Sequence, residues 1–272
     1  MLIRNVALSA AVAFVPAAAF AQTDYFNTDR GRPLQVQDAI PIERYAFELQ
    51  AAPLRWSRTA GANGVWSVEP ELAYGVLPRT QLEIGVPLLH VDGSVTGAGA
   101  LHVSVLHALN VETLGIPALA VSAGYSGPTG PFGPPDAYAT FGLLATRTTS
   151  LGRLHVNADA SLVDEIAATD EVWNTPRAAG LDHVSRWLVG VAGDRTFPLR
   201  SMLVGVELFA RQPILAGSEV EWTAGAGLRW QLDPWWALDA GLGRSFGDDR
   251  EWSLTFGAAR SFGILKLFPL GR

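Results

Sequence analysis

Apolar and polar residues alternate one by one in short segments that recur from about residue 41 towards the C-terminus. In residues 65–76, for example, Trp66 and Val68 fall on one face, and Ser67 and Glu69 fall on the other. Successive side chains of a β-strand point to opposite faces, so this pattern predicts strands with one apolar and one polar face. The predicted strands lie at 42–56, 65–76, 80–91, 99–109, 117–126, 137–148, 153–162, 185–197, 201–212, 220–232, 236–246 and 252–262.

The overall hydropathy indicates what the apolar faces meet. The mean hydropathy is +0.19, and aromatic residues make up 10% of the chain, with 9 Trp. Beyond the N-terminal region, no segment approaches the roughly 18 unbroken apolar residues that a membrane-spanning helix needs. A membrane protein without such helices must be a closed barrel, because lipid leaves no partner for the backbone groups of a sheet edge. We therefore expect an all-β fold, a transmembrane antiparallel β-barrel of about twelve strands.

The connections between the predicted strands fall into two classes. Tight turns at 77–79, 149–152, 198–200 and 233–235 interleave with looser segments at 57–64, 92–98, 127–136, 163–184, 213–219 and 247–251. Outer-membrane barrels have short periplasmic turns and longer outer loops, which is the same asymmetry. A soluble secreted β-sandwich is the alternative fold, but its turns have similar lengths at both ends.

Aromatic residues collect at the ends of the predicted strands, as they do at the two membrane interfaces of barrels. The aromatic residues expected at outer ends are Trp66, Trp187, Trp222 and Trp252, and those expected at periplasmic ends are Tyr45, Tyr74, Trp230, Trp236 and Phe262.

The N-terminus has the pattern of an export signal. Arg4 precedes a mostly apolar run, and Ala19 and Ala21 occupy the small-residue positions before a cleavage site, so the mature chain is expected to begin at Gln22. We divide the chain into a cleaved signal peptide at 1–21, a segment at 22–40, the barrel at 41–262 and a tail at 263–272. The polar segment 22–40 is either a loose periplasmic tail or a plug that enters the lumen. The expected location is the bacterial outer membrane.

Composition limits the partners and cofactors. The net charge of −6 makes nucleic acid an unexpected partner, and the absence of cysteine excludes disulfides and thiolate metal sites. The five His are not paired at a recognised metal spacing, so no metal or cofactor is expected. The expected partners are outer-membrane lipid, a small-molecule substrate and, during biogenesis, the barrel-assembly machinery.

Two stretches resemble a known family. RPLQVQDAIPIERYAFELQ (32–50), and VSRWLVGVAGDRTFPLRS (184–201) followed by EWTAGAGLRWQLDPWWALDAGLG (221–243), resemble the outer-membrane transporter family named for the meta-pathway of phenol degradation. The resemblance implies a barrel that passes small molecules, aromatic or hydrophobic ones included. The final strand resembles the C-terminal signal read by the barrel-assembly machinery, with Gly257 and Phe262 matching and Arg260 replacing the usual aromatic residue.

The strand faces that we expect to point inward carry nine carboxylates and four arginines. These lumen-lining candidates are Arg44, Glu48, Glu69, Glu71, Glu83, Asp159, Arg186, Asp194, Glu207, Arg211, Glu221, Arg229 and Asp239. In a barrel of this size they either line a narrow pore or pair with one another and fill it. An open lumen with this surplus of negative charge is expected to prefer cations.

A hydrolase and a purely structural barrel are the alternative functions. His183 and Ser185 resemble the His-x-Ser arrangement of outer-membrane phospholipase A, itself a twelve-stranded barrel, and Gln212 is the only evident residue to orient the histidine. Because such a triplet arises easily by chance, we expect no enzyme and no catalytic residue, and the predicted function is passage of small molecules.

Overall fold

The computed structural model describes residues 26–51, 54–59, 64–91, 96–167, 181, 184–246 and 251–263. Its strands are β1 (Ala46–Gln50), β2 (Leu54–Thr59), β3 (Val65–Val68), β4 (Glu71–Leu77), β5 (Thr80–Gly85), β6 (Leu88–Val91), β7 (Thr96–Ala98), β8 (Ala100–Ala108), β9 (Ala118–Pro128), β10 (Tyr138–Thr148), β11 (Arg153–Leu162), β12 (Ser185–Phe197), β13 (Met202–Pro213), β14 (Glu221–Asp233), β15 (Trp236–Phe246) and β16 (Glu251–Gly263). No helix in these ranges is long and apolar enough to cross a membrane.

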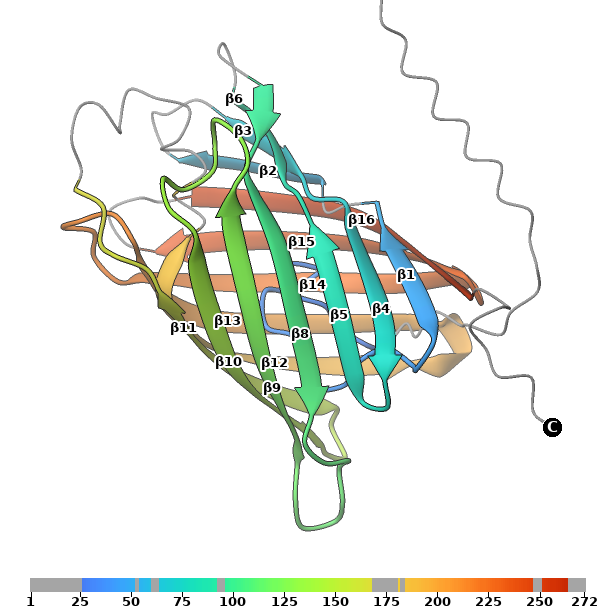
Figure 1. The fold of residues 1–272 in the computed structure, drawn as a ribbon. Helices are drawn as coiled ribbons and strands as arrows, with labels where there is room; N and C mark the ends of the chain where they lie inside the picture. Colours follow the sequence, from blue (N-terminus) through green and yellow to red (C-terminus); the bar gives the residue numbers. More distant parts are fainter. Residues whose placement is uncertain are drawn as a thin grey trace, which may run out of the picture.

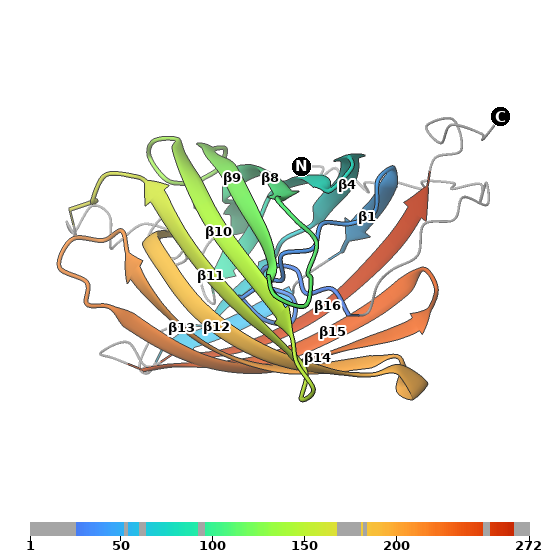
Figure 2. The ribbon, with the colours of Figure 1, turned by 90° about the horizontal axis from the view of Figure 1, so that it is seen from below.

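The strands form one closed antiparallel barrel (Figures 1 and 2). The ring has twelve positions, and we call each position a stave because some positions consist of two strands in line. Each stave pairs with the next along the chain, and β1 closes the ring on β16, with Ala46 opposite Gly263. All twelve predicted strands are present, with ends that shift by a few residues. The alternating pattern located them because one face of each strand had to be apolar and the other polar.

Four of the twelve staves are interrupted, so each consists of two strands. These pairs are β1 with β2, β4 with β3, β5 with β6, and β8 with β7. Pro70, Pro87 and Gly99 lie at three of the breaks. Proline has no N–H to donate to the ladder, so a break at Pro70 and Pro87 follows from covalent structure. Single backbone hydrogen bonds, such as the one from the Gly99 N–H to the Pro87 carbonyl at 2.8 Å, link neighbouring staves at these breaks.

The two ends of the barrel differ. At the turn end, where β1 begins and β16 ends, the chain reverses in short turns such as Pro78–Arg79 and the 3-10 turn η1 (Pro198–Arg200). Residues 109–117 are an exception at this end. Their Glu112 accepts hydrogen bonds from the N–H and hydroxyl of Thr148 at 2.7 Å each, which joins two neighbouring turns. The longer connections lie at the opposite, loop end.

The barrel is apolar outside and polar inside. Outward residues such as Val206, Leu143 and Phe256 are more than half exposed, whereas inward residues such as Asn157 and Arg229 are almost fully buried. A soluble sandwich would bury its apolar faces, so this arrangement is that of a membrane barrel.

Candidate functional site in the barrel lumen

Residues 26–45 precede β1 and enter the lumen at the turn end. Figure 2 shows this segment in blue, enclosed by the strands. Leu34 and Val36 are fully buried there and pack against Ala192 of β12 and Phe209 of β13. We call residues 29–39 the lumen segment. It has no regular structure of its own, so its backbone groups need partners on the barrel wall.

Inward side chains supply those partners. Glu207 Oε2 accepts hydrogen bonds from the N–H groups of Gln35 and Val36, at 2.8 and 2.9 Å. Asn157 binds both backbone groups of Gln37: its Oδ1 accepts from the N–H at 2.8 Å, and its Nδ2 donates to the carbonyl at 2.9 Å. These side chains bind the backbone of the middle of the lumen segment with hydrogen bonds, in place of the backbone groups that a neighbouring strand would supply.

The segment's exit is held in the same way. The Ala39 N–H donates to Thr146 Oγ1 at 2.9 Å, and the Ile42 N–H donates to Gln81 Oε1 at 2.7 Å. The wall residues that contact the lumen segment come from β10, β11 and β13, and Gln81 of β5 binds Ile42, three residues after the segment.

A buried ionic cluster fixes the turn of the lumen segment. Arg32 is fully buried and lies 2.9 Å from Asp29, 3.2 Å from Glu48 and 3.7 Å from Asp239. Arg229 of β14 lies 2.9 Å from Asp29 and 2.6 Å from Asp239. Two cations thus share three carboxylates. Removal of one partner from such a cluster leaves an uncompensated buried charge, which is strongly destabilising.

A second polar cluster lies nearer the turn end. Arg153 forms ion pairs with Asp194 at 2.6 Å and with Asp38 of the lumen segment at 3.2 Å. His155 lies between Thr146 and Asp194, with ring nitrogens 3.0 Å from each. The three groups have the order of a hydroxyl–histidine–carboxylate triad. They are buried, however, and Thr146 already accepts the Ala39 N–H, so the cluster holds the lumen segment in place.

Inward glycines make room for the lumen segment. A Cβ atom on Gly227 would lie 2.6 Å from the Cβ of Pro33, and one on Gly205 would lie 2.8 Å from Leu34. A Cβ on Gly190 would lie 2.6 Å from Val36. Real Cβ atoms do not approach other carbons so closely, so these strands accept the segment only because they carry glycine there. The sequence reasoning missed this feature, whose signal is glycine at alternate, inward positions of consecutive strands.

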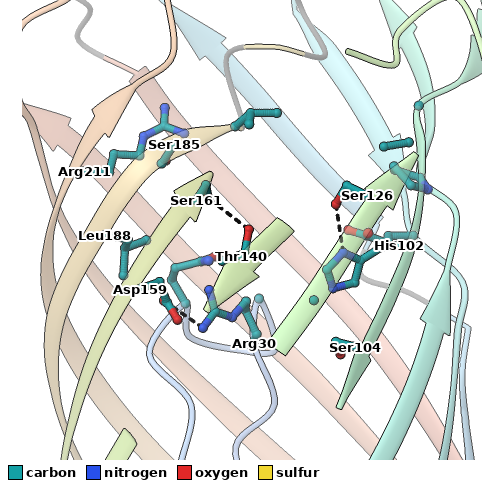
Figure 3. Close-up of a pocket in the computed structure, with 18 of the residues that line it drawn as sticks. Arg30, His102, Ser104, Ser126, Thr140, Asp159, Ser161, Ser185, Leu188 and Arg211 are labelled. Carbon is teal, nitrogen blue, oxygen red and sulfur yellow. Dashed lines mark hydrogen bonds and ion pairs between the residues drawn. The ribbon is translucent and has the colours of Figure 1, made fainter. Parts of the chain in front are cut away.

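The half of the lumen towards the loop end holds a cavity of about 550 Å³ (Figure 3). Arg30, Gln35 and Gln37 of the lumen segment contribute to its lining. Arg30 forms an ion pair with Asp159 at 2.8 Å, as Figure 3 shows. Hydroxyl groups and His102 cover much of the wall between β8 and β11, including the pairs Thr140–Ser161 at 2.9 Å and His102–Ser126 at 3.1 Å.

The cavity has an acidic wall made by Glu69, Glu71 and Glu83, from β5 and from the stave of β3 and β4. Glu83 accepts hydrogen bonds from Gln81 at 2.6 Å and Ser104 at 2.9 Å. Glu69 and Glu71 have no hydrogen bond and no cation within 4.0 Å among the residues described. Their carboxyl groups are therefore available to a solute in the cavity.

The predicted inward residues fall into three groups. Glu69, Glu71, Glu83, Asp159, Arg211 and Glu221 line the cavity. Glu48, Asp194, Glu207, Arg229 and Asp239 contact the lumen segment or its ionic clusters. Arg44 and Arg186 lie elsewhere. Of the predicted inward charges, Arg211 pairs with Glu221 and Arg229 pairs with Asp239, each at 2.6 Å, and Glu48, Asp159 and Asp194 pair with arginines outside this set. The acidic wall has no ion pair with described residues.

Arg44 and Arg186 correct the sequence prediction. Arg44 is exposed before the start of β1, with its guanidinium 4.4 Å from the Tyr45 ring centroid, because the strand begins four residues later than predicted. Arg186 lies near the start of β12, exposed and 3.6 Å from Glu165, because a β-bulge between Ser185 and Trp187 reverses the alternation. The same bulge turns Trp187 into the cavity, away from the outer aromatic positions.

The residues of the hydrolase alternative do not form a catalytic arrangement. Ser185 lines the cavity, and His183 lies outside the described residues. Gln212 donates to the carbonyl of Ser218 at 2.7 Å. Within the described ranges, no group of three or more His, Asp or Glu residues could hold a metal ion.

Comparison with known proteins places the fold in a class. No family model and no curated protein sequence matches the chain, so membership of the phenol-degradation family is not shown. Among solved structures, the COG4313 outer membrane channel from Pseudomonas putida F1 superposes with a TM-score of 0.52 at 14% identity, over 86% of this chain and all of that one.

A second similar structure, the KdgM porin in complex with disordered oligogalacturonate, has a TM-score of 0.50 at 12% identity, over 79% of this chain and 99% of that one. The outer membrane phospholipase A from Escherichia coli has a TM-score of only 0.44 at 9% identity, which is too distant to bear on the hydrolase alternative. The chain therefore has the fold of outer-membrane β-barrel proteins, a class that includes this porin and this channel.

Proposed function

We propose that the chain is an outer-membrane channel for small solutes of a Gram-negative bacterium, exported by its signal peptide and restricted inside by the lumen segment. The observation that carries this proposal is the polar cavity of about 550 Å³ above that segment. A lumen lined by charged and hydroxyl groups, inside a barrel whose outer face is apolar, is the arrangement of water-filled barrel channels.

The chemistry of two opposite walls of the cavity indicates the kind of solute that it would bind. Glu69 and Glu71 attract positive charge, and Trp187, Leu188 and Phe209 supply an apolar surface on β12 and β13. In the order of the ring, β12 lies six staves from β4, so the two walls face each other. The cavity therefore fits a small solute that combines a cationic or polar group with an apolar ring. This retains the aromatic substrate that the family resemblance implied and adds a preference of charge.

Ion selectivity tests the proposal. We expect the native barrel in planar bilayers to conduct and to favour K⁺ over Cl⁻ in a KCl gradient. The carboxylates bias ion entry through a field focused by low-dielectric walls. Salt should weaken the bias, because the Debye length falls from about 10 Å at 0.1 M to about 3 Å at 1 M.

The variant Glu69→Gln/Glu71→Gln/Glu83→Gln should shift the reversal potential towards zero while conductance persists. Glu112→Gln is the control, because Glu112 lies on the exposed 109–117 connection and outside the cavity. Anion preference in the native barrel, or an unchanged reversal potential in the triple variant, would contradict the assignment of the acidic wall. Absence of conductance in both the native barrel and a variant without residues 29–39 would remove the channel proposal itself.

A further inference from the structure

Two arginines flank a tryptophan on the outer surface of the barrel near the loop end. Arg58 of β2 is opposite Trp252 of β16, and Trp252 is opposite Arg244 of β15. Their sequence neighbours Ser253 and Ser245 line the cavity, so the alternation directs Arg58, Trp252 and Arg244 outward. We call these three residues the arginine–tryptophan patch.

The patch lies among outward aromatic residues at the same end. Trp222 is opposite Phe246 on one side, and Trp56 is opposite Trp66 on the other. Trp222, Phe246 and Trp252 are each about half exposed. Aromatic girdles of this kind mark the level of lipid headgroups in membrane barrels. The patch is therefore at headgroup height, with Leu242 and Phe256 towards the hydrocarbon on the same strands.

The charges of the patch are left without a protein counter-charge among the residues described. No described carboxylate lies within 4.0 Å of the Arg58 or Arg244 guanidinium. The Arg244 guanidinium stacks 4.4 Å from the Trp252 ring centroid, which fixes one charge above the ring. Adjacent strands are about 4.8 Å apart, so the two arginines start roughly 10 Å apart on either side of Trp252. Guanidinium groups on a surface facing lipid are best satisfied by phosphate oxygens, which they bind with charge-assisted hydrogen bonds.

We propose that the arginine–tryptophan patch binds the phosphorylated headgroup of a lipid in the outer leaflet. Arg58 and Arg244 donate hydrogen bonds to phosphate oxygens from two sides, and Trp252 packs between them against the uncharged part of the headgroup. This inference rests on the proposed membrane location, with the loop end outward, and is independent of what passes through the lumen.

The turn end supplies a matched control. Arg260 of β16 also faces outward and lies 5.3 Å from the centroid of Trp236, but Leu49 occupies the position on its other side. Arg260 therefore shares with Arg244 the residue type, the outward direction and a similar aromatic contact, but it has no second arginine across the tryptophan.

The test uses the full-length barrel folded into phosphatidylcholine vesicles, with heat-dependent mobility in gel electrophoresis as a separate check of insertion. Vesicles then receive a minor fraction of a diphosphorylated glycolipid, and glycolipid retained by the barrel after extraction into detergent is measured by native mass spectrometry. A dephosphorylated form of the same lipid is the second probe. We expect the native barrel to retain the phosphorylated lipid and not the dephosphorylated one.

Arg58→Gln/Arg244→Gln should weaken retention at least about tenfold, because the charge-assisted hydrogen bonds from both guanidinium groups to the phosphate are lost. Arg260→Gln should retain the lipid as the native barrel does. Equal retention by Arg58→Gln/Arg244→Gln, or an equal loss in Arg260→Gln, would overturn the proposal. Failure of the native barrel to insert would contradict the membrane location instead, so the two failures are distinguishable.

Discussion

At the residue scale, neighbouring positions on one strand face different media. Val206 lies at the middle of β13 and is 59% exposed on the outer face, whereas Glu207 points inward and accepts two N–H groups of the lumen segment. An arginine facing lipid at the bilayer midplane costs about 2 to 4 kcal/mol, and one in the lumen costs far less.

We therefore expect Val206→Arg to lower the free energy of unfolding in lipid vesicles by about 2 to 4 kcal/mol, and Glu207→Arg to lower it less. Denaturant titration of both variants in the same vesicles gives the comparison. Glu207→Arg should instead change conductance, because the carboxylate that binds Gln35 and Val36 is lost. Equal destabilisation of the two variants would show that the faces of β13 are assigned wrongly.

At the element scale, the lumen segment is held by wall contacts and by the space that inward glycines leave. Gly227 lies directly beneath Pro33, while its neighbour Ala226 faces outward on the same strand. A valine at position 227 would overlap the rigid proline ring, so the segment must move away from β14. The closest overlap is with the segment, because the nearest barrel atom, the backbone O of Ala240, would lie 3.2 Å from the added Cβ against 2.6 Å for Pro33. We therefore expect the backbone pairing of β14 to persist in the variant.

Gly227→Val is expected to raise single-channel conductance above that of the native barrel, and Ala226→Val is expected to leave it unchanged. Planar-bilayer recordings of the two variants measure this, with gel mobility as evidence that both barrels fold. A native conductance in Gly227→Val, in a barrel that folds normally, would mean that the lumen segment does not restrict the channel.

At the scale of the whole molecule, the described chain begins at the turn end of the barrel. Phe26, the first described residue, receives a hydrogen bond at its carbonyl oxygen from Arg153 near the turn end, and the chain passes from there into the lumen. Cleavage before Gln22 would leave only four residues ahead of this contact.

We expect N-terminal sequencing of the protein from outer membranes to begin at Gln22. The small residues Ala19 and Ala21 direct cleavage to that site, and a variant with Ala21→Phe should accumulate the longer precursor. A membrane-fraction protein that begins at Met1 would contradict the export prediction.

The sequence by itself determined the class of fold. Alternation with period two defines which face of a strand is apolar whatever its partner is, so all twelve staves and the direction of Glu69, Glu71 and Glu83 could be predicted from local order alone. Alternation predicted the wrong direction for the Arg186 side chain, because a β-bulge adds one residue to one strand of a pair. Whether a bulge forms depends on how β12 pairs with β13.

Only the tertiary structure decided where residues 26–45 lie and which charges remain free in the lumen. The segment has no periodic pattern, and its backbone is bound by side chains as far away in sequence as Glu207, which is 172 positions from Gln35. Whether an inward carboxylate pairs depends in the same way on its neighbours across strands. Asp239 meets Arg229 and Arg32, while Glu71 meets no described cation within 4.0 Å. Such contacts depend on strand register and barrel closure, which bring together residues that local sequence order does not relate.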